Sequence, residues 1–143
     1  MTGFLIAILS GALMSVQGVF NTQLTKTVGM WVSNGWVQFT ALLLCIVAWF
    51  FNGRDSISTI MKVEPKYALL GGVLGAFITW TVIKSVEQLG PAKSALFIVI
   101  TQLIVSYLIE MFGIFGMEKE PFEWRKLIGM GIALTGVAIF QWK

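Results

Sequence analysis

The sequence predicts an all-α membrane protein whose five transmembrane helices form a single domain, residues 1–143. Of its 143 residues, 57% are hydrophobic and only 12% are charged, whereas a soluble protein has about 25% charged residues. The apolar residues also gather in long runs, and one span needs about 20 of them. Five spans take about 100 residues. What remains suffices only for short connections, so we expect no extramembrane domain.

The expected helices cover the apolar runs in order, over residues 3–24, 30–52, 67–86, 92–116 and 126–142. The first starts at the N-terminus, which has neither the basic region nor the cleavage pattern of a signal peptide, so we interpret this run as a span. A small polar stretch, residues 25–29, separates the first helix from the second. The longest polar loop, residues 53–66, precedes the third.

Glycine and proline mark the next boundary. Leu89-Gly90-Pro91 predicts the end of the third helix and the start of the fourth, because Gly suits a helix end and Pro suits a first turn. The most charged stretch, residues 117–126, precedes the fifth helix. That helix has about 17 residues, the minimum for a span, and no polar stripe, so we expect it to pack or to form a dimer contact. Gly71 and Gly75 likewise predict close helix packing.

The basic residues and tryptophans bear on membrane orientation. Tryptophans fall near predicted helix ends, as in an aromatic belt, at Trp31, Trp49, Trp124 and Trp142. The face of the N-terminus carries six basic residues, Arg54, Lys62, Lys66, Lys119, Arg125 and Lys126, and the other face four, Lys26, Lys84, Lys93 and Lys143. This excess predicts a cytoplasmic N-terminus. Because it is small, insertion in both orientations stays open.

Three predicted helices each carry one line of polar or small residues, since residues spaced by four or seven share a helix face. Amide and hydroxyl groups in lipid either join helices or orient a ligand. The first line is Gly3, Ser10, Gln17 and Asn21; the second is Asn34, Gln38, Ala41, Cys45 and Ala48; the third is Gln102, Ser106 and Glu110. The candidate substrate-binding residues among them are Gln17, Asn21, Asn34, Gln38, Gln102 and Ser106. Tyr107, also inside a run, is expected to pack or to face lipid.

Glu110 is the candidate coupling residue. The run that contains it, residues 92–116, has only one other charge, Lys93. An acid at a helix centre costs about 2.5 to 3.5 kcal/mol on insertion scales, and such residues handle protons, ions or substrates. The nearest basic residues, Lys84 and Lys93, lie toward the opposite end of the helix pair, so we expect no basic partner. Removal from water disfavours a charged carboxylate. We therefore predict that Glu110 binds a proton and a ligand in turn, as a proton-coupled antiporter requires.

The composition argues against catalysis, nucleic-acid binding and a metal cofactor. The chain has no histidine and a single cysteine, Cys45, so it offers neither a Cys/His metal cluster nor a histidine-based site. The net charge of +3 is spread over loops and forms no basic stripe for nucleic acid. We therefore expect a lipid bilayer and a small-molecule substrate as partners, with no cofactor beyond a proton gradient.

Several segments resemble the drug/metabolite transporter (DMT) superfamily and, within it, the short YdcZ-type inner-membrane exporters. The resemblance covers nearly the whole chain and rests on residues 11–21, 71–76, 89–92, 101–103, 109–113 and 126–136. Three positions depart from the family pattern: Thr101 replaces a common Gly, Glu110 a common Asp and Glu87 an expected Pro. The first two bear on ligand fit.

The resemblance implies one half of a DMT-type inverted-repeat transporter in the bacterial inner membrane. Such a chain completes itself by pairing with an inverted copy, as an antiparallel homodimer or a heterodimer with a paralogue. The leading hypothesis is proton-coupled export of a small organic metabolite or drug-like solute by alternating access, with the site at the interface between repeats. Two alternatives stay open: a small dual-topology membrane channel and a membrane subunit of a larger assembly.

Overall fold

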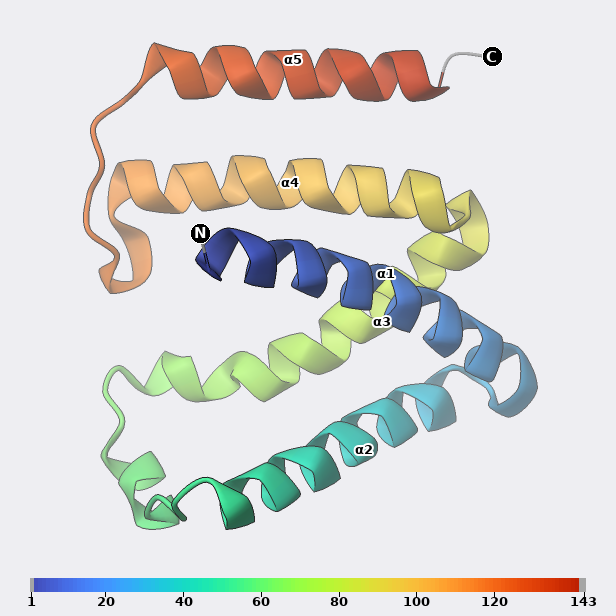
Figure 1. Cartoon of the computed structure of the whole chain (residues 1–143), viewed down its shortest axis with the longest axis vertical. Coiled ribbons are helices and arrows are strands. Elements are labelled where there is room, and N and C mark those ends of the chain that lie inside the picture. The colour runs from blue at the N-terminus through green and yellow to red at the C-terminus, as the bar shows by residue number, and fades with distance from the viewer. Residues whose placement is uncertain (1, 142–143) are drawn as a thin grey trace. The chain divides into compact units, whose positions relative to one another are not determined.

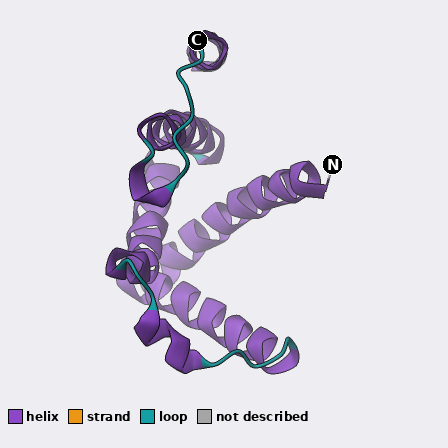
Figure 2. Cartoon of the chain, turned by 90° about the vertical axis from the view of Figure 1, so that its left-hand side faces the viewer, coloured by secondary structure: helices purple, strands orange, loops and turns teal. Residues whose placement is uncertain are grey.

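The computed structural model describes residues 2–141, and in this range every regular element is a helix (Figure 2). The long helices, shown in Figure 1, are α1 (Thr2–Val28), α2 (Met30–Phe51), α3 (Gly71–Leu89), α4 (Pro91–Phe112) and α5 (Trp124–Gln141). The short 3-10 helices are η1 (Ile57–Lys62), η2 (Lys66–Leu70) and η3 (Ile114–Gly116). Internal contacts divide the chain into two units, Met1–Gln88 and Leu89–Lys143. We describe each by itself.

In unit 1, a single residue separates α1 from α2. Gly29 has φ 83° and ψ 163°, a backbone region that is essentially restricted to glycine. The prediction that the first helix ends at residue 24 is wrong, because the polar stretch after it stays helical. Thr25 Oγ1 donates to Asn21 O at 2.8 Å, and Gly29 N donates to Thr25 O at 2.9 Å. The Thr hydroxyl is thus satisfied by its own helix and needs no loop.

Unit 1 continues through a long connection to α3. The second predicted helix agrees with α2 to within a residue, whereas the third begins as the 3-10 turn η2 and runs on to Leu89. Close approach of α1 to α3 occurs at Gly18, where an added Cβ would lie 3.5 Å from Val82 Cγ1 and 3.7 Å from Val86 Cγ2. The α1–α2 hairpin and α3 therefore pack together in this unit.

In unit 2, α4 begins as predicted and ends earlier. Gly90, with φ 81° and ψ 163°, precedes Pro91 at the first helical position, which repeats the geometry of Gly29. At the other end, the prediction of helix to residue 116 is wrong. Gly113 has φ 64° and ψ 36°, a left-handed conformation that commonly ends helices. The chain then forms η3 and an extended segment before α5.

Four of the segments are long and apolar enough to cross a membrane, among the described residues: Thr2–Val28, Met30–Phe51, Lys66–Leu89 and Pro91–Phe112. The fifth predicted helix exists as α5, but it is not among these segments, and its crossing of the membrane remains a prediction. The first four expose most of their large apolar side chains, such as Phe4 at 72% and Leu44 at 69%. Surfaces of this kind require lipid or a partner around them.

Three of the four tryptophans predicted near helix ends, Trp31, Trp49 and Trp124, lie in the first or last turn of a helix. Trp31 and Trp124 are each 71% exposed at the starts of α2 and α5, and Trp49 Nε1 donates to Asp55 O at 2.8 Å beyond the end of α2. Trp142 lies outside the described residues. Among the residues that the structure describes, nothing packs closely at Gly71 and Gly75, because an added Cβ at either position would meet nothing within 4 Å.

Candidate functional site

The polar residues of unit 1 meet where α2 leaves the Gly29 link. Asn21 is 7% exposed, Asn34 is 3% exposed and Ser33 is fully buried. Ser33 Oγ donates to Asn21 O at 3.3 Å, and Ser33 N donates to Gly29 O at 3.0 Å. The sharp turn at Gly29 therefore places the last turns of α1 beside the first turns of α2, and both predicted asparagines are buried there.

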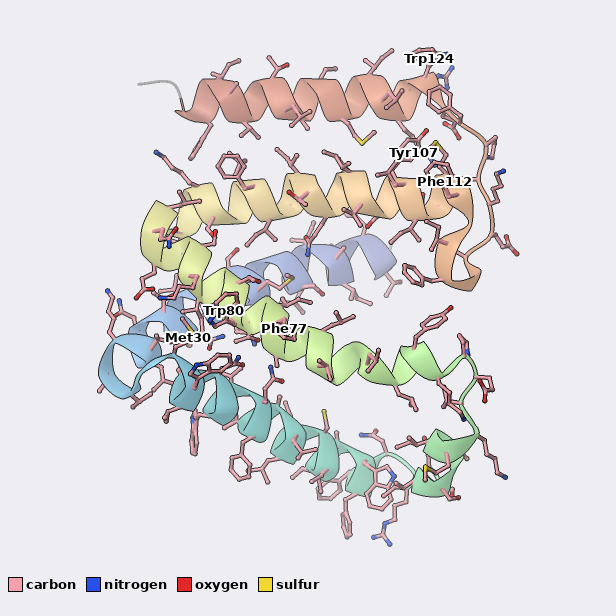
Figure 3. The ribbon with its side chains drawn as sticks, turned by 180° about the vertical axis from the view of Figure 1, so that it is seen from behind. Met30, Phe77, Trp80, Tyr107, Phe112 and Trp124 are labelled. Atoms are coloured by element: carbon pink, nitrogen blue, oxygen red, sulfur yellow. The ribbon has the colours of Figure 1, made fainter. Side chains whose placement is uncertain are left out.

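Two side-chain amides of α2 then reach α3. Asn34 Nδ2 donates to Ala76 O at 2.9 Å, and Gln38 Nε2 donates to Thr79 Oγ1 at 3.3 Å. Phe77 and Trp80 belong to the same stretch of α3 (Figure 3). Because residues 34 and 38 are one turn apart, the predicted polar line of the second helix faces α3. We call this group, Asn21, Ser33, Asn34, Gln38 and Thr79, the amide centre.

The amide centre has one unsatisfied atom. Asn34 Oδ1 is buried and has no hydrogen-bond partner among the described residues. A buried acceptor without a donor costs about 1 to 3 kcal/mol, so this oxygen is a position where a donor from outside the chain would be stabilised. Gln17, predicted to belong to the same site, is exposed on α1.

In unit 2, Glu110 lies in the last turn of α4 and does have a basic partner. Its Oε2 is 3.8 Å from Lys126 Nζ, and the two side chains are 41% and 35% exposed. Lys126 also forms an ion pair with Glu120. The expectation of a carboxylate with no basic partner is wrong, because α4 ends at Phe112 and the following loop returns to it. We call Tyr107, Glu110, Glu120 and Lys126 the charged centre.

Backbone contacts hold the loop against the end of α4. Glu120 N donates to Glu110 O at 3.0 Å, and Glu123 N donates to the hydroxyl oxygen of Tyr107 at 3.2 Å. Tyr107 is only 6% exposed, and Lys126 Nζ lies 5.6 Å from its ring centroid. The ammonium group is thus close to the C-terminal end of a helix, where positive charge is favoured. Figure 3 shows Tyr107, Phe112 and Trp124 at this end of unit 2.

The other predicted residues of α4 are less constrained. Gln102 and Ser106 are both exposed. The helix is continuous from Pro91 to Phe112, so their spacing of four residues places them on the same face as Glu110. They form an open polar line that leads along α4 to the charged centre.

Sequence reasoning missed five residues of these centres: Ser33, Thr79, Tyr107, Glu120 and Lys126. Ser33 occurs one turn after a glycine link, and this spacing could have indicated a buried hydroxyl. Tyr107 was expected to pack or to face lipid, yet it is buried and its hydroxyl oxygen accepts a hydrogen bond from Glu123 N. Lys126 was counted as a loop charge, since nothing local in the sequence shows that a loop following Gly113 folds back.

The centres differ in the chemistry they can perform. The amide centre can exchange hydrogen bonds with an uncharged ligand. The charged centre holds a carboxylate whose counter-ion comes from another helix, so it can exchange a proton or a ligand donor against an ion pair. Neither combination resembles a nucleophile with an activating base.

A family model described as "Putative inner membrane exporter, YdcZ" matches residues 2–139 of the chain. No curated protein and no solved structure matches it. The family match covers almost the full length, and it agrees with the four apolar helices in indicating a multi-pass protein of the inner membrane. The family is one of exporters and is not a class of enzymes.

Proposed function

We infer that this chain, which belongs to the YdcZ family of inner-membrane exporters, moves a small organic solute by proton-coupled alternating access. The observation that carries the coupling proposal is the Glu110–Lys126 pair, whose Nζ–Oε2 distance is 3.8 Å. The pair joins α4 to α5. A second acid near a span end, Glu87, pairs with Lys84 on its own helix at 3.0 Å. A change in the packing of α4 against α5 alters the Glu110–Lys126 distance, whereas it leaves the Lys84–Glu87 pair, which lies within one helix, unchanged.

The proposed mechanism alternates the partner of Glu110. In the ionised form, the carboxylate attracts Lys126 and accepts donors from a ligand. When a proton enters, the neutral acid no longer attracts the ammonium group, and Lys126 keeps its ion pair with Glu120. Ligand binding on the other side favours the ionised form and returns the proton to water. One proton thus moves inward for each solute that moves outward.

A proton-flux assay in liposomes tests this proposal. We would load the vesicles with a pH-sensitive dye and add a panel of small alcohols, amides and amines. Glu110→Gln, which keeps the shape of the side chain and removes its charge, should abolish solute-dependent proton movement. Glu87→Gln is the matched control and should retain it. If Glu110→Gln transports as the parent does, with unchanged pH dependence, the mechanism is wrong.

The proposed transporter is a dimer of oppositely inserted chains. In support of this, Gly129 and Gly136 of α5 lie seven residues apart on one face of the helix, an added Cβ at either would meet nothing within 4 Å, and small residues on a helix face favour close approach of a second helix in membranes. The near balance of basic residues between the two faces is compatible with both orientations.

Cysteine labelling tests the dual orientation. In a Cys45→Ser background, single cysteines would be placed at Thr27, in the last turn of α1, and at Ser58, in the α2–α3 connection. A membrane-impermeant reagent added outside intact cells should label a fraction of each variant. Complete labelling of one position and none of the other would exclude insertion in both orientations.

A further inference from the structure

The orientation of the Asn34 amide determines which kind of group its site accepts. Asn34 Nδ2 donates to Ala76 O at 2.9 Å, a carbonyl that can only accept. Rotating the amide by half a turn would bring two acceptors together, so the hydrogen-bond network assigns the oxygen to the unsatisfied position. The free atom, Oδ1, is therefore an acceptor, and its missing partner is a donor.

The backbone beside this amide is not covered by side chains. Gly35 follows Asn34, and Gly72 and Gly75 precede Ala76 on α3. An added Cβ at any of these glycines would meet nothing within 4 Å. Small residues alone do not make a site, but Gly35 follows Asn34 and the other two precede its partner Ala76, and Asn34 is only 3% exposed and has an unused acceptor.

The charges on the three long helices of unit 1 disfavour ionic ligands at this position. Helix α2 has no charged residue, and α1 has only Lys26, in its last turn. Helix α3 has Lys84 and Glu87, which pair with each other at 3.0 Å. An anion would meet an acceptor without compensating donors, and a cation would find no free carboxylate on these helices. Burial of an ion without a partner is unfavourable.

We propose that Asn34 Oδ1 binds a hydroxyl or amide N–H of the transported solute, and that this solute is neutral. The proposal rests on the proposed function, since it names the substrate class of the same exporter. Asn34 orients the solute on the α2–α3 crossing, while Gln38 and Thr79 hold the next turns together. An analogue without the donor group should bind more weakly, because it would leave the acceptor oxygen of Asn34 unpaired.

Isomeric probes that differ in one donor test the proposal. Benzyl alcohol and anisole have the same formula, as do 1-butanol and diethyl ether, but only the alcohols donate. The chain has three asparagines, Asn21, Asn34 and Asn52, so labelling asparagine with ¹³C at Cγ gives few signals in solid-state NMR of the protein in lipid bilayers. Asn34→Gln assigns the signal of residue 34. Asn52, exposed at the end of α2, is the internal control.

The alcohols should shift the Asn34 signal saturably, with half-saturation about ten-fold below that of the matched ethers, while Asn52 does not move. Equal shifts with alcohol and ether, or no shift with either alcohol, would overturn the proposal. The measurement is made at equilibrium without a proton gradient, so it does not depend on Glu110. The Glu110→Gln variant should show the same shifts. If Glu110→Gln shows these shifts and still couples protons, the proposed proton mechanism is wrong, while the proposed binding at Asn34 is supported.

Discussion

The amide centre of unit 1 and the charged centre of unit 2 place their polar groups in opposite environments. Asn21 and Asn34 are neutral and less than a tenth exposed. Glu110 and Lys126 are charged and remain over a third exposed, at 41% and 35%. Transfer of a neutral amide out of water costs little free energy when a hydrogen bond replaces its hydration, whereas transfer of an ion costs far more. The chain accordingly buries amides at helix crossings and keeps ions at a helix end.

We propose that this difference gives the two centres separate tasks. The buried amides supply a fixed hydrogen-bond pattern that a neutral ligand can read. The ion pair, near the end of a helix and shared with Glu120, can change partners without exposing an unpaired charge to lipid. Recognition in one unit and coupling in the other is the division that the following substitutions test.

The largest expected effect comes from placing a charge in the amide centre. Asn34→Asp should lose about 3 kcal/mol of stability at neutral pH, because an ionised carboxylate would be buried against Ala76 O without a basic partner. The loss should shrink as the pH falls, since the protonated acid is neutral. Reversible unfolding in mixed micelles measures both. Asn52→Asp, at an exposed position, is the control and should lose little. Equal losses for the two variants would show that Asn34 is not buried in the membrane.

The next effect concerns the link that creates the amide centre. Gly29→Ala should lose about 2 kcal/mol, because φ 83° and ψ 163° lie in a region that residues with a Cβ avoid. Gly11→Ala, inside α1 with nothing within 4 Å of an added Cβ, should be neutral or gain up to about 1 kcal/mol. Thermal melts of both variants would measure the difference. A harmless Gly29→Ala would mean that the hairpin turns by another geometry.

Gly113 performs the corresponding role for the charged centre, with a smaller expected effect. Gly113→Ala should lose about 1 kcal/mol from its left-handed conformation. Its Cβ would also lie 3.2 Å from Lys119 Cβ and displace the loop that carries Glu120. Gly116→Ala, at φ 80° with no atom near an added Cβ, shares the strain without the contact. Only Gly113→Ala should alter proton coupling. Equal coupling in both variants would show that the position of the loop does not affect proton coupling.

The sequence predicted features that depend on neighbouring residues, and it missed features that depend on residues far apart in the chain. Apolar runs and the Gly90-Pro91 pair locate helices because they act locally, and four spans follow from them. The helix ends at Val28 and Phe112 were missed. Polar threonines can bond to their own helix, and the conformation of Gly113 depends on the loop that packs against it.

Site residues show the same limit. Asn34 and Gln38 were identified by their spacing, which is a property of one helix. Their partners, Ala76 O and Thr79, lie about 40 residues further on and have no local signature. Glu110 was selected as a charge in an apolar run, whereas Lys126 reaches it only through the returning loop. Sequence spacing therefore predicted which residues share a helix face, and it did not predict what they contact.

The smallest expected effect on stability is that of Lys126→Gln. The two ion pairs that this change removes, with Glu110 and Glu120, join side chains that are 35% to 50% exposed, and such pairs contribute little because water and salt screen them. The melting temperature should hardly change, and added salt should affect the variant less than the parent. Arg125→Gln, one residue earlier at the start of α5, controls for loss of a positive charge. Proton coupling, in contrast, should be impaired only in Lys126→Gln, because Glu110 then loses its alternating partner. A loss of stability as large as that of Asn34→Asp would show that the charged centre is as dry as the amide centre, and the proposed division between recognition and coupling would no longer hold.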